Sequence, residues 1–409
     1  MPAFVANLGE TVLEAAAAGV SSIDKSKPQP STMSAMTQTA SVPVIDISQF
    51  VSTADESDSA CGLIAQALHD YGCLVVKDPR VEASANEKFL DMMERYFDQS
   101  DGKTDARPDL HYQVGVTPSE VEKPRGHCAF GKTLKDVPVS ECPPVPDAKW
   151  RFFWRVGERP AETAFEELNA PAVVPEAFER EWKPTMDGWG EKLVGTAETV
   201  AEMAAIGFGL DRAAFKDRMT CGPHLLAPTG SDLKHLADTD AASEGDGADA
   251  EASAPKKPRL LGQPVGLNTV LAGFHYDLNF LTIHGKSRFP GLKVWTRDGH
   301  AVAPKIPPGH LFLQAGKQFE YLTGGHVLAG FHEVIAHKQC AIAAREAKKN
   351  NKSTWRVSST CFAHIASDVT LEPIGKFASD DLKAKYPPIK TGDQVQEELI
   401  AISLGAKKA

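Results

Sequence analysis

The second half of the chain is a series of short β-prone runs separated by glycine and proline turns. The runs are "LNTVLAGF", "NFLTIHG", "LKVWT", "HLFLQAG", "FEYLTGG", "FHEVIAH" and "WRVSSTCFAHI". Several short strands at close spacing favour a sandwich or a barrel, because each strand must find pairing partners and bury one face. We therefore predict a mainly β core over about residues 221–365.

The first half of the chain reads differently, because its apolar residues recur at helical spacing. After a short β-prone run, "VPVIDISQF", helical patterns appear in "DSACGLIAQALHDYG", "ASANEKFLDMMERYFDQS" and "FEREWKPTMDGWGEKLVGTAETVAEMAAIGFGL". We predict a helical half over about 41–220 that supports the β core, and a C-terminal helix at about 391–404. Together these segments are expected to form a single domain over 41–409.

Two segments have the composition of disordered chain. Within residues 1–40 the stretch "SKPQPSTMSAMTQTAS", which starts at Ser26, is polar, small and interrupted by proline, and residues 237–258 hold six acidic residues with almost no bulky apolar side chain. Segments of this kind cannot bury enough apolar surface to offset the entropy of ordering. We predict a disordered N-terminal tail and a disordered acidic insertion within the β region.

Charge and cysteine content narrow the function classes. The formal net charge is −10 and the isoelectric point is about 5.7, which argues against bulk nucleic-acid binding. No apolar run approaches the ~18 residues that suggest a membrane span. The seven cysteines are odd in number and show no CxxC spacing, which favours free thiols in a reducing compartment. We expect a cytoplasmic protein with a small-molecule partner, and the oligomeric state is not constrained.

The stretch "AGFHYDLNFLTIHG" carries His275 and Asp277 two residues apart in a strand context. Residues i and i+2 of a strand point to the same face, so the imidazole and the carboxylate should lie together. The pair could bind a metal, act in proton transfer, or form a structural hydrogen bond. Two histidines and one carboxylate can hold Fe(II) with one face open. Downstream histidines in β-prone contexts could supply the third ligand: His284, His310, His326, His332 and His337.

The block from His275 to Ile365 resembles the isopenicillin N synthase-like family of non-haem iron oxygenases, most of which depend on 2-oxoglutarate. That family shows H-x-D, a glycine-leucine strand start, a T-x-G turn, a histidine nine residues after the threonine, and R-x-S on a later strand. Here Gly291-Leu292 supplies the strand start and Thr323 the turn, so the histidine is His332. Arg356-Val357-Ser358 supplies the R-x-S pattern.

The resemblance implies a double-stranded β-helix, or jelly-roll barrel, with supporting N-terminal helices. It implies that His275, Asp277 and His332 bind the metal, with no further catalytic residue. Arg356 and Ser358 would hold the far carboxylate of the cosubstrate, because a guanidinium fork matches a carboxylate.

The function that the resemblance implies is a dioxygenase that uses Fe(II), 2-oxoglutarate and O2. It would oxidise, by default hydroxylate, a small organic substrate and release succinate and CO2. One alternative is an iron-dependent oxidase of the same fold that does not use 2-oxoglutarate. Another is a non-catalytic metal-binding barrel with a binding or regulatory role.

The chain departs from the family pattern at three places, one of which is the acidic insertion just upstream of the H-x-D strand. His332 and Arg356 are 24 residues apart, a longer gap than is usual, and the polar segment "REAKKNNKST" lies between them. Arg345 is closer to the usual offset, but Ala347 stands where the serine should be. The family also tends to have a tyrosine that helps to bind 2-oxoglutarate, whereas the neighbourhood of Cys221 has none.

Overall fold

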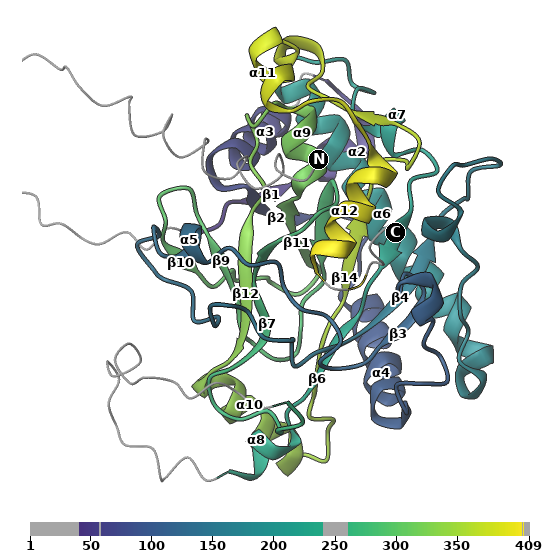
Figure 1. Ribbon diagram of the computed structural model, residues 1–409, viewed down its shortest axis with the longest axis vertical. Coiled ribbons are helices and arrows are strands. Elements are labelled where there is room, and N and C mark those ends of the chain that lie inside the picture. Colours follow the sequence, from purple (N-terminus) through teal and green to yellow (C-terminus); the bar gives the residue numbers. More distant parts are fainter. Residues whose placement is uncertain (1–40, 57–58, 240–260, 403, 405–409) are drawn as a thin grey trace, which may run out of the picture. The chain divides into compact units, whose positions relative to one another are not determined.

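The computed structural model describes residues 41–56, 59–239, 261–402 and 404 (Figure 1). The part that begins at Ser41 forms one compact unit by its internal contacts. The predicted tail, 1–40, and most of the acidic insertion lie outside the described residues, and the boundaries of a single domain at 41–409 stay a prediction. No helix in the described part of the chain has the length and apolar character to cross a membrane.

Two main sheets dominate the described chain, so the prediction of a mainly β protein with helices is confirmed. The larger sheet has ten strands in the order β1-β2-β11-β8-β14-β5-β4-β6-β13, with β3 paired to β4, and the smaller has the order β10-β9-β12-β7. A two-stranded sheet joins β15 to β16. The strands are β1 Val44–Asp46, β2 Cys73–Lys77, β3 Gly115–Thr117, β4 Trp150–Val156, β5 His224–Leu226, β6 Thr229–Asp232, β7 Thr269–Tyr276, β8 Leu281–His284, β9 Leu292–Trp295, β10 Ala301–Val302, β11 His310–Ala315, β12 Phe331–Ala336, β13 Trp355–Ser358, β14 Thr360–Ala363, β15 Thr370–Leu371 and β16 Ile389–Lys390.

The longest helix, α6 (Glu179–Gly207), supports the larger sheet. Its residues Trp182, Met186, Trp189 and Leu193 are buried and follow the spacing of one helix face. This helix contacts β4, β5, β8 and β14 as well as α3 and α4. The other helices are α2 Ser48–Thr53, α3 Ser59–Tyr71, α4 Ala83–Gln99, η1 Pro108–Leu110, α5 Cys128–Gly131, η2 Glu166–Asn169, η3 Glu176–Phe178, α7 Lys216–Met219, α8 Lys234–Asp238, α9 Lys317–Leu322, α10 Lys338–Lys349, η5 Gly375–Phe377, α11 Asp380–Lys385 and α12 Thr391–Ala401.

The half of the chain predicted to be mainly helical, 41–220, also contributes four strands to the larger sheet: β1 and β2 lie in the β-prone runs "VPVIDISQF" and "CLVVKD", whereas β3 and β4 are not predicted by the sequence pattern. Strand β2 pairs with β11, and β4 pairs with both β5 and β6. The run "FEYLTGG", predicted as a strand, instead lies mostly in the helix α9. Its apolar side chains Phe319 and Leu322 are buried on one helix face, which a short apolar run does not distinguish from a strand.

The long gap before Arg356 is filled by a helix. Helix α10 begins two residues after β12 ends and packs against α8, as Figure 1 shows. Ala237 and Asp238 belong to α8, and Ala237 is buried in the cluster between the two helices. The acidic insertion therefore begins later than the predicted residue 237.

The cysteines are not all free thiols, contrary to the sequence prediction. Cys128 and Cys142 form a disulfide across the loop that precedes β4. The other five cysteines are free, and four of them are buried. The 14-residue separation of the bonded pair gives no sequence signal, so the pairing emerges only from the folded loop.

Candidate metal and cosubstrate site

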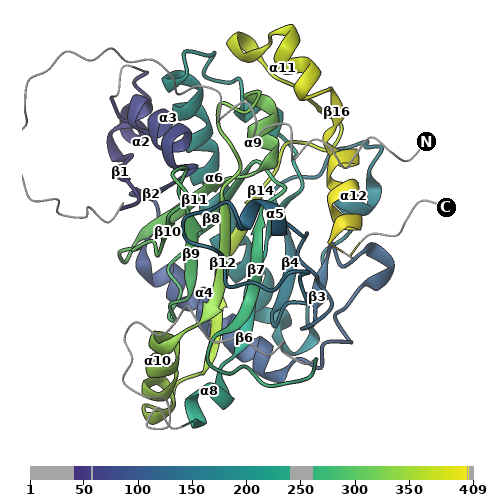
Figure 2. The ribbon, with the colours of Figure 1, turned by 60° about the vertical axis from the view of Figure 1, so that its left-hand side comes forward.

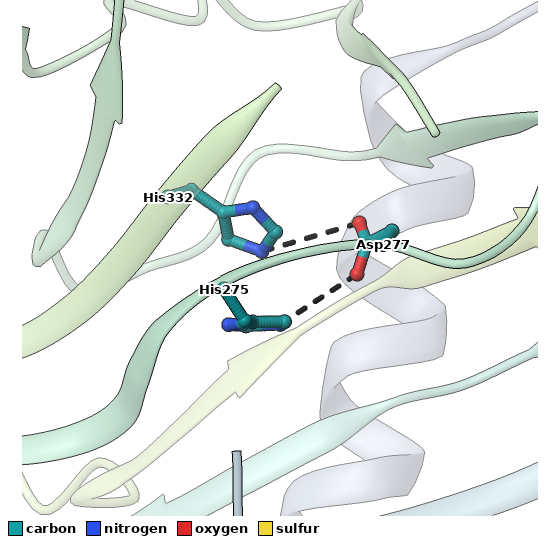
Figure 3. Close-up of side chains that lie close together, drawn as sticks. All are labelled: His275, Asp277 and His332. Atoms are coloured by element: carbon teal, nitrogen blue, oxygen red, sulfur yellow. Dashed lines mark ion pairs between the residues drawn. The ribbon is translucent and has the colours of Figure 1, made fainter. Parts of the chain in front are cut away.

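Neighbouring strands of the smaller sheet bring together the three predicted metal ligands. Strands β7 and β12 are antiparallel, and their register sets His332 directly opposite His275. Asp277 follows immediately after β7 ends at Tyr276. The two imidazole rings lie with centroids 4.3 Å apart, and the carboxylate faces both of them (Figure 3).

The distances between the three groups are those of a compact ligand set. His275 Nε2 lies 3.6 Å from Asp277 Oδ1, and His332 Nε2 lies 4.0 Å from Asp277 Oδ2. One ligand atom from each residue lies within 4.8 Å of the others, and among the described residues this is the one group of three such side chains. Asp277 and His332 are buried, and His275 is partly exposed. The described structure thus assembles the set that the sequence predicts.

Hydrogen bonds fix how these side chains point. His275 Nδ1 lies 2.5 Å from the carbonyl oxygen of Gly273, which leaves Nε2 facing the carboxylate. The Thr282 hydroxyl donates to Asp277 Oδ2 at 2.6 Å. His332 Nδ1 is buried and has no hydrogen-bond partner among the described residues. A metal ligand needs this kind of orientation, because the group that bonds one ring nitrogen determines which lone pair is available.

Electrostatics favour an ionised carboxylate beside a neutral imidazole. Burial alone would raise the pKa of Asp277, but His332, His275 and Thr282 together hold it below its usual range. Burial lowers the pKa of His332 to about 3, and the charge of His275 adds to the effect. Burial would also lower the pKa of His275, but Asp277 raises it above its usual value. Asp277 and His332, two of the three predicted ligands, are therefore in the protonation state that metal binding requires.

A cavity of about 730 Å³ opens beside the three side chains. Both sheets contribute to its wall: β7, β9 and β12 from the smaller sheet, and β4, β5, β6, β8, β13 and β14 from the larger one. Figure 2 shows β9, β12 and β7 side by side, in the order of the smaller sheet. This volume is in the range of small-molecule sites in proteins.

Arg356 and Ser358 line the same cavity from β13. The Arg356 side chain is buried, its Nε donates to the carbonyl oxygen of Pro290 at 2.9 Å, and no carboxylate pairs with it within the described chain. Ser358 Oγ lies 2.5 Å from Thr360 Oγ1, which in turn lies 2.9 Å from His284 Nδ1. An unpaired buried charge is costly, so a cation in this position favours the binding of an anion.

The other histidines and the competing arginine lie in different places. Arg345 is on α10, donates to the carbonyl oxygen of Thr239, and does not line the cavity. His326 stacks on His69 away from the site. His284 lines the cavity, as does His337. The geometry thus favours Arg356 over Arg345 as the carboxylate anchor.

Sequence reasoning missed the charged residues of the cavity wall. Strand β4 begins at Trp150 in "KWRFFWRV", where alternation places Lys149, Arg151 and Phe153 on one face. All three line the cavity. The alternation of Lys149, Arg151 and Phe153 is present in the sequence, but aromatic residues on both faces of the strand make it hard to recognise. In the neighbourhood of Cys221, where this chain lacks the tyrosine of the family, β5 presents Leu225 to the cavity.

Two comparisons of sequence find proteins similar to this chain. Residues 42–177 match the sequence model of the family described as non-haem dioxygenase in morphine synthesis, N-terminal. The chain is 23% identical over 219 residues to Kihadalactone A synthase LFS of Citrus sinensis, a match that covers 52% of this chain and 53% of that protein. The chain thus spans about half the length of this curated relative.

Solved structures share the fold over most of the chain. A full-length Neurospora crassa protein in complex with alpha-KG has a TM-score of 0.62 at 16% identity, covering 88% of this chain and 96% of that one. A putative 2OG-Fe(II) oxygenase family protein from Caulobacter crescentus has a TM-score of 0.60 at 20% identity, covering 89% and 100%. JOX2 in complex with 2OG, Fe and JA has a TM-score of 0.57 at 18% identity, covering 97% and 94%.

Proposed function

We propose that the chain oxidises a small organic substrate with Fe(II), 2-oxoglutarate and O2. The premise of this proposal is that the chain belongs to the non-haem Fe(II)/2-oxoglutarate oxygenase family, which its matched segment and its fold support. The matched segment and the shared fold support the family-level resemblance. The narrower isopenicillin N synthase-like assignment and the cytoplasmic location stay predictions.

One observation carries the proposal. His275, Asp277 and His332 converge at the wall of a cavity whose opposite sheet presents the uncompensated cation of Arg356. A dicarboxylate that reaches from a metal to an arginine matches that arrangement. We further propose that the two main sheets are the two halves of a double-stranded β-helix. The strand orders support this, because β7, β9 and β12 are neighbours in one sheet and β8, β11 and β14 in the other.

The side chains present fit Fe(II). Two imidazoles and one carboxylate can occupy one face of a six-coordinate ion and leave the other face open. His275 Nε2 faces the site because its Nδ1 contacts Gly273, and Thr282 holds the carboxylate of Asp277 in place. When bound, Fe(II) with 2-oxoglutarate and O2 would supply the oxidising chemistry and release succinate and CO2.

Arg356 and Ser358 would bind the far carboxylate of 2-oxoglutarate. Both lie on the cavity side of β13, two residues apart. Since Arg356 Nε is already used by Pro290, its terminal nitrogens would donate to the carboxylate. The Ser358 hydroxyl would add a second donor, and Thr360 holds it in position.

Related structures support a small-molecule substrate. The Neurospora crassa protein was solved with thymine and with 5-formyluracil, and JOX2 with JA. We propose hydroxylation as the default outcome, with desaturation or ring closure as uses of the same oxidant. The oxidase without 2-oxoglutarate and the non-catalytic barrel remain the alternatives that an assay must separate.

The decisive experiment measures succinate from the iron-loaded protein with 2-oxoglutarate across a metabolite panel. The proposal expects one class of compound to stimulate succinate release, and Asp277→Ala to abolish it. Substrate consumption without succinate would favour the 2-oxoglutarate-independent oxidase. Iron binding with neither product nor succinate, across a broad panel, would favour the non-catalytic barrel.

A further inference from the structure

The charged side chains of the cavity wall are paired with one another, with a single buried exception. Among the described residues, the cations that line the cavity from within are Arg125, Lys149, Arg151 and Arg356. The first three each face a carboxylate of the same wall, and Arg356 does not. At the mouth, Lys286 is exposed to solvent, and Arg288 is held by three carboxylates of α4.

The inner group is a buried, electrically balanced network of four residues. Lys149 Nζ lies 2.7 Å from Asp147 Oδ2 and 3.1 Å from Glu122 Oε1, and Arg151 Nη2 lies 2.5 Å from Glu122 Oε2. Two cations and two carboxylates cancel. The Arg151 guanidinium also lies 4.3 Å from the Phe153 ring, and its Nε has no hydrogen-bond partner among the described residues. Arg151 Nε can therefore donate a hydrogen bond to a bound molecule, although the four-residue network as a whole carries no net charge.

The outer group joins the C-terminal helix to the strand that carries one of the metal ligands. Arg125 Nη1 donates to Glu398 Oε1 of α12 at 2.8 Å, and the Tyr276 hydroxyl donates to the same oxygen at 3.3 Å. Val395 and Leu399, on the same face of α12, also line the cavity. A substrate lying against this wall therefore meets apolar surface beside one donor group and one acceptor group.

Charge balance then restricts the substrate. The argument rests on the proposed function, because it assigns Arg356 to the far carboxylate of 2-oxoglutarate. Within the described part of the wall, no unpaired interior cation remains for an anionic substrate, and an unpaired carboxylate is expensive to bury. We propose that the substrate is an uncharged molecule with an apolar body, whose amide-type edge, an N–H beside a C=O, meets Glu398 and Arg125.

Pairs of probes that differ only in charge test this inference. The pairs are phenylacetate with phenylacetamide, and indole-3-acetate with indole-3-acetamide. Anaerobic calorimetric titration uses the full chain loaded with Fe(II) and saturating 2-oxoglutarate, so that the cosubstrate occupies Arg356. We expect each amide to bind the parent protein at least as tightly as its acid.

Substitutions at the outer pair make the test independent of the true substrate. Glu398→Gln is nearly isosteric and leaves Arg125 without its counter-charge. It should tighten binding of both acids at least tenfold, which is about 1.4 kcal/mol, and change binding of the amides much less. Adding Arg125→Gln to that variant should remove the gain. Asp393→Asn, at the start of the same helix and outside the cavity lining, makes the same change in net charge and should leave acid binding unchanged.

Two results would overturn the inference. One is tighter binding of the acids than of the amides by the parent protein, with the preference lost on Arg125→Gln. The other is a Glu398→Gln variant, folded by its melting profile, that binds acids no better than the parent. Whether the parent protein binds 2-oxoglutarate is measured separately, from the visible absorption band of the Fe(II)-loaded protein; absence of the band means that it does not bind. That result would refute the proposed function and leave the acid–amide comparison to judge the charge pairing.

Discussion

Replacing Arg356 tests the cosubstrate assignment most directly. The side chain is buried, and no carboxylate within the described chain competes for it. Truncating one member of a buried, charge-assisted pair typically weakens binding by about 2–5 kcal/mol. At ~1.4 kcal/mol per factor of ten, Arg356→Ala should weaken 2-oxoglutarate binding by at least ~30-fold. Arg356→Lys should recover only part, because lysine keeps the charge and loses the fork.

The assay is an anaerobic titration of the Fe(II) protein with 2-oxoglutarate, followed by the visible band that chelation produces. A parallel titration with 2-oxobutyrate, which has no far carboxylate, isolates the contact. Arg356→Ala should affect 2-oxobutyrate binding little, so the difference between the two ligands measures the guanidinium contact alone. Iron affinity should change little in either case.

Arg345→Ala is the matched control. Arg345 is the arginine closer to the family offset, yet its side chain contacts Thr239 outside the cavity. It should be nearly silent in both titrations. A band lost in Arg345→Ala and kept in Arg356→Ala would refute the reasoning. Equal weakening of both ligands in Arg356→Ala would show a general disturbance of the site instead of a lost carboxylate contact.

Three further predictions concern the metal, the pH dependence of stability and the acidic insertion. His332→Ala should lose most Fe(II) binding in an anaerobic titration while His326→Ala keeps it, and the reverse result would refute the ligand assignment. Burial raises the pKa of Glu94 from 4.5 to about 7, so the folded protein retains a proton that the unfolded chain has released. The free energy of unfolding should therefore fall as pH rises from 4.5 to 7. Denaturant titrations at several pH values in that window should show that the free energy of unfolding of Glu94→Gln depends less on pH than that of the parent protein. Replacing residues 240–258 by a short glycine-serine link should leave the melting temperature nearly unchanged. Leu236→Ala, in the buried α8–α10 contact, should instead lower the melting temperature by several degrees. Equal effects of the two changes would contradict this prediction.

Local spacing predicted the position of the candidate ligands because their geometry is local. His275 and Asp277 follow from strand alternation, and His332 follows from its offset to Thr323, which sits in the turn before β12. The register of β7 on β12 then brings the rings together. That these side chains bind iron stays a prediction, and only their convergence is observed.

The parts that the sequence did not reveal depend on contacts between distant segments. Strand β4 is buried on both faces, so its pattern of aromatic and basic residues shows no simple polar alternation. Arg125 and Glu398 are 273 residues apart, and nothing in either neighbourhood indicates the pairing. The same holds for Cys128 and Cys142, whose spacing is uninformative without the loop that brings them together.

The order of strands in the larger sheet has a consequence for how the protein is made. Strand β2 (Cys73–Lys77) pairs with β11 (His310–Ala315), and β5 pairs with β14, which ends at Ala363. During translation β2 can pair with β1 at once, but more than 200 further residues must be synthesised before its second partner, β11, leaves the ribosome. Pairings of such high sequence separation form slowly, and unpaired strand edges promote aggregation while they wait. We expect nascent chains that stop before residue 310 to depend on chaperones for solubility, and the three candidate metal ligands to come together only after β12 has been synthesised.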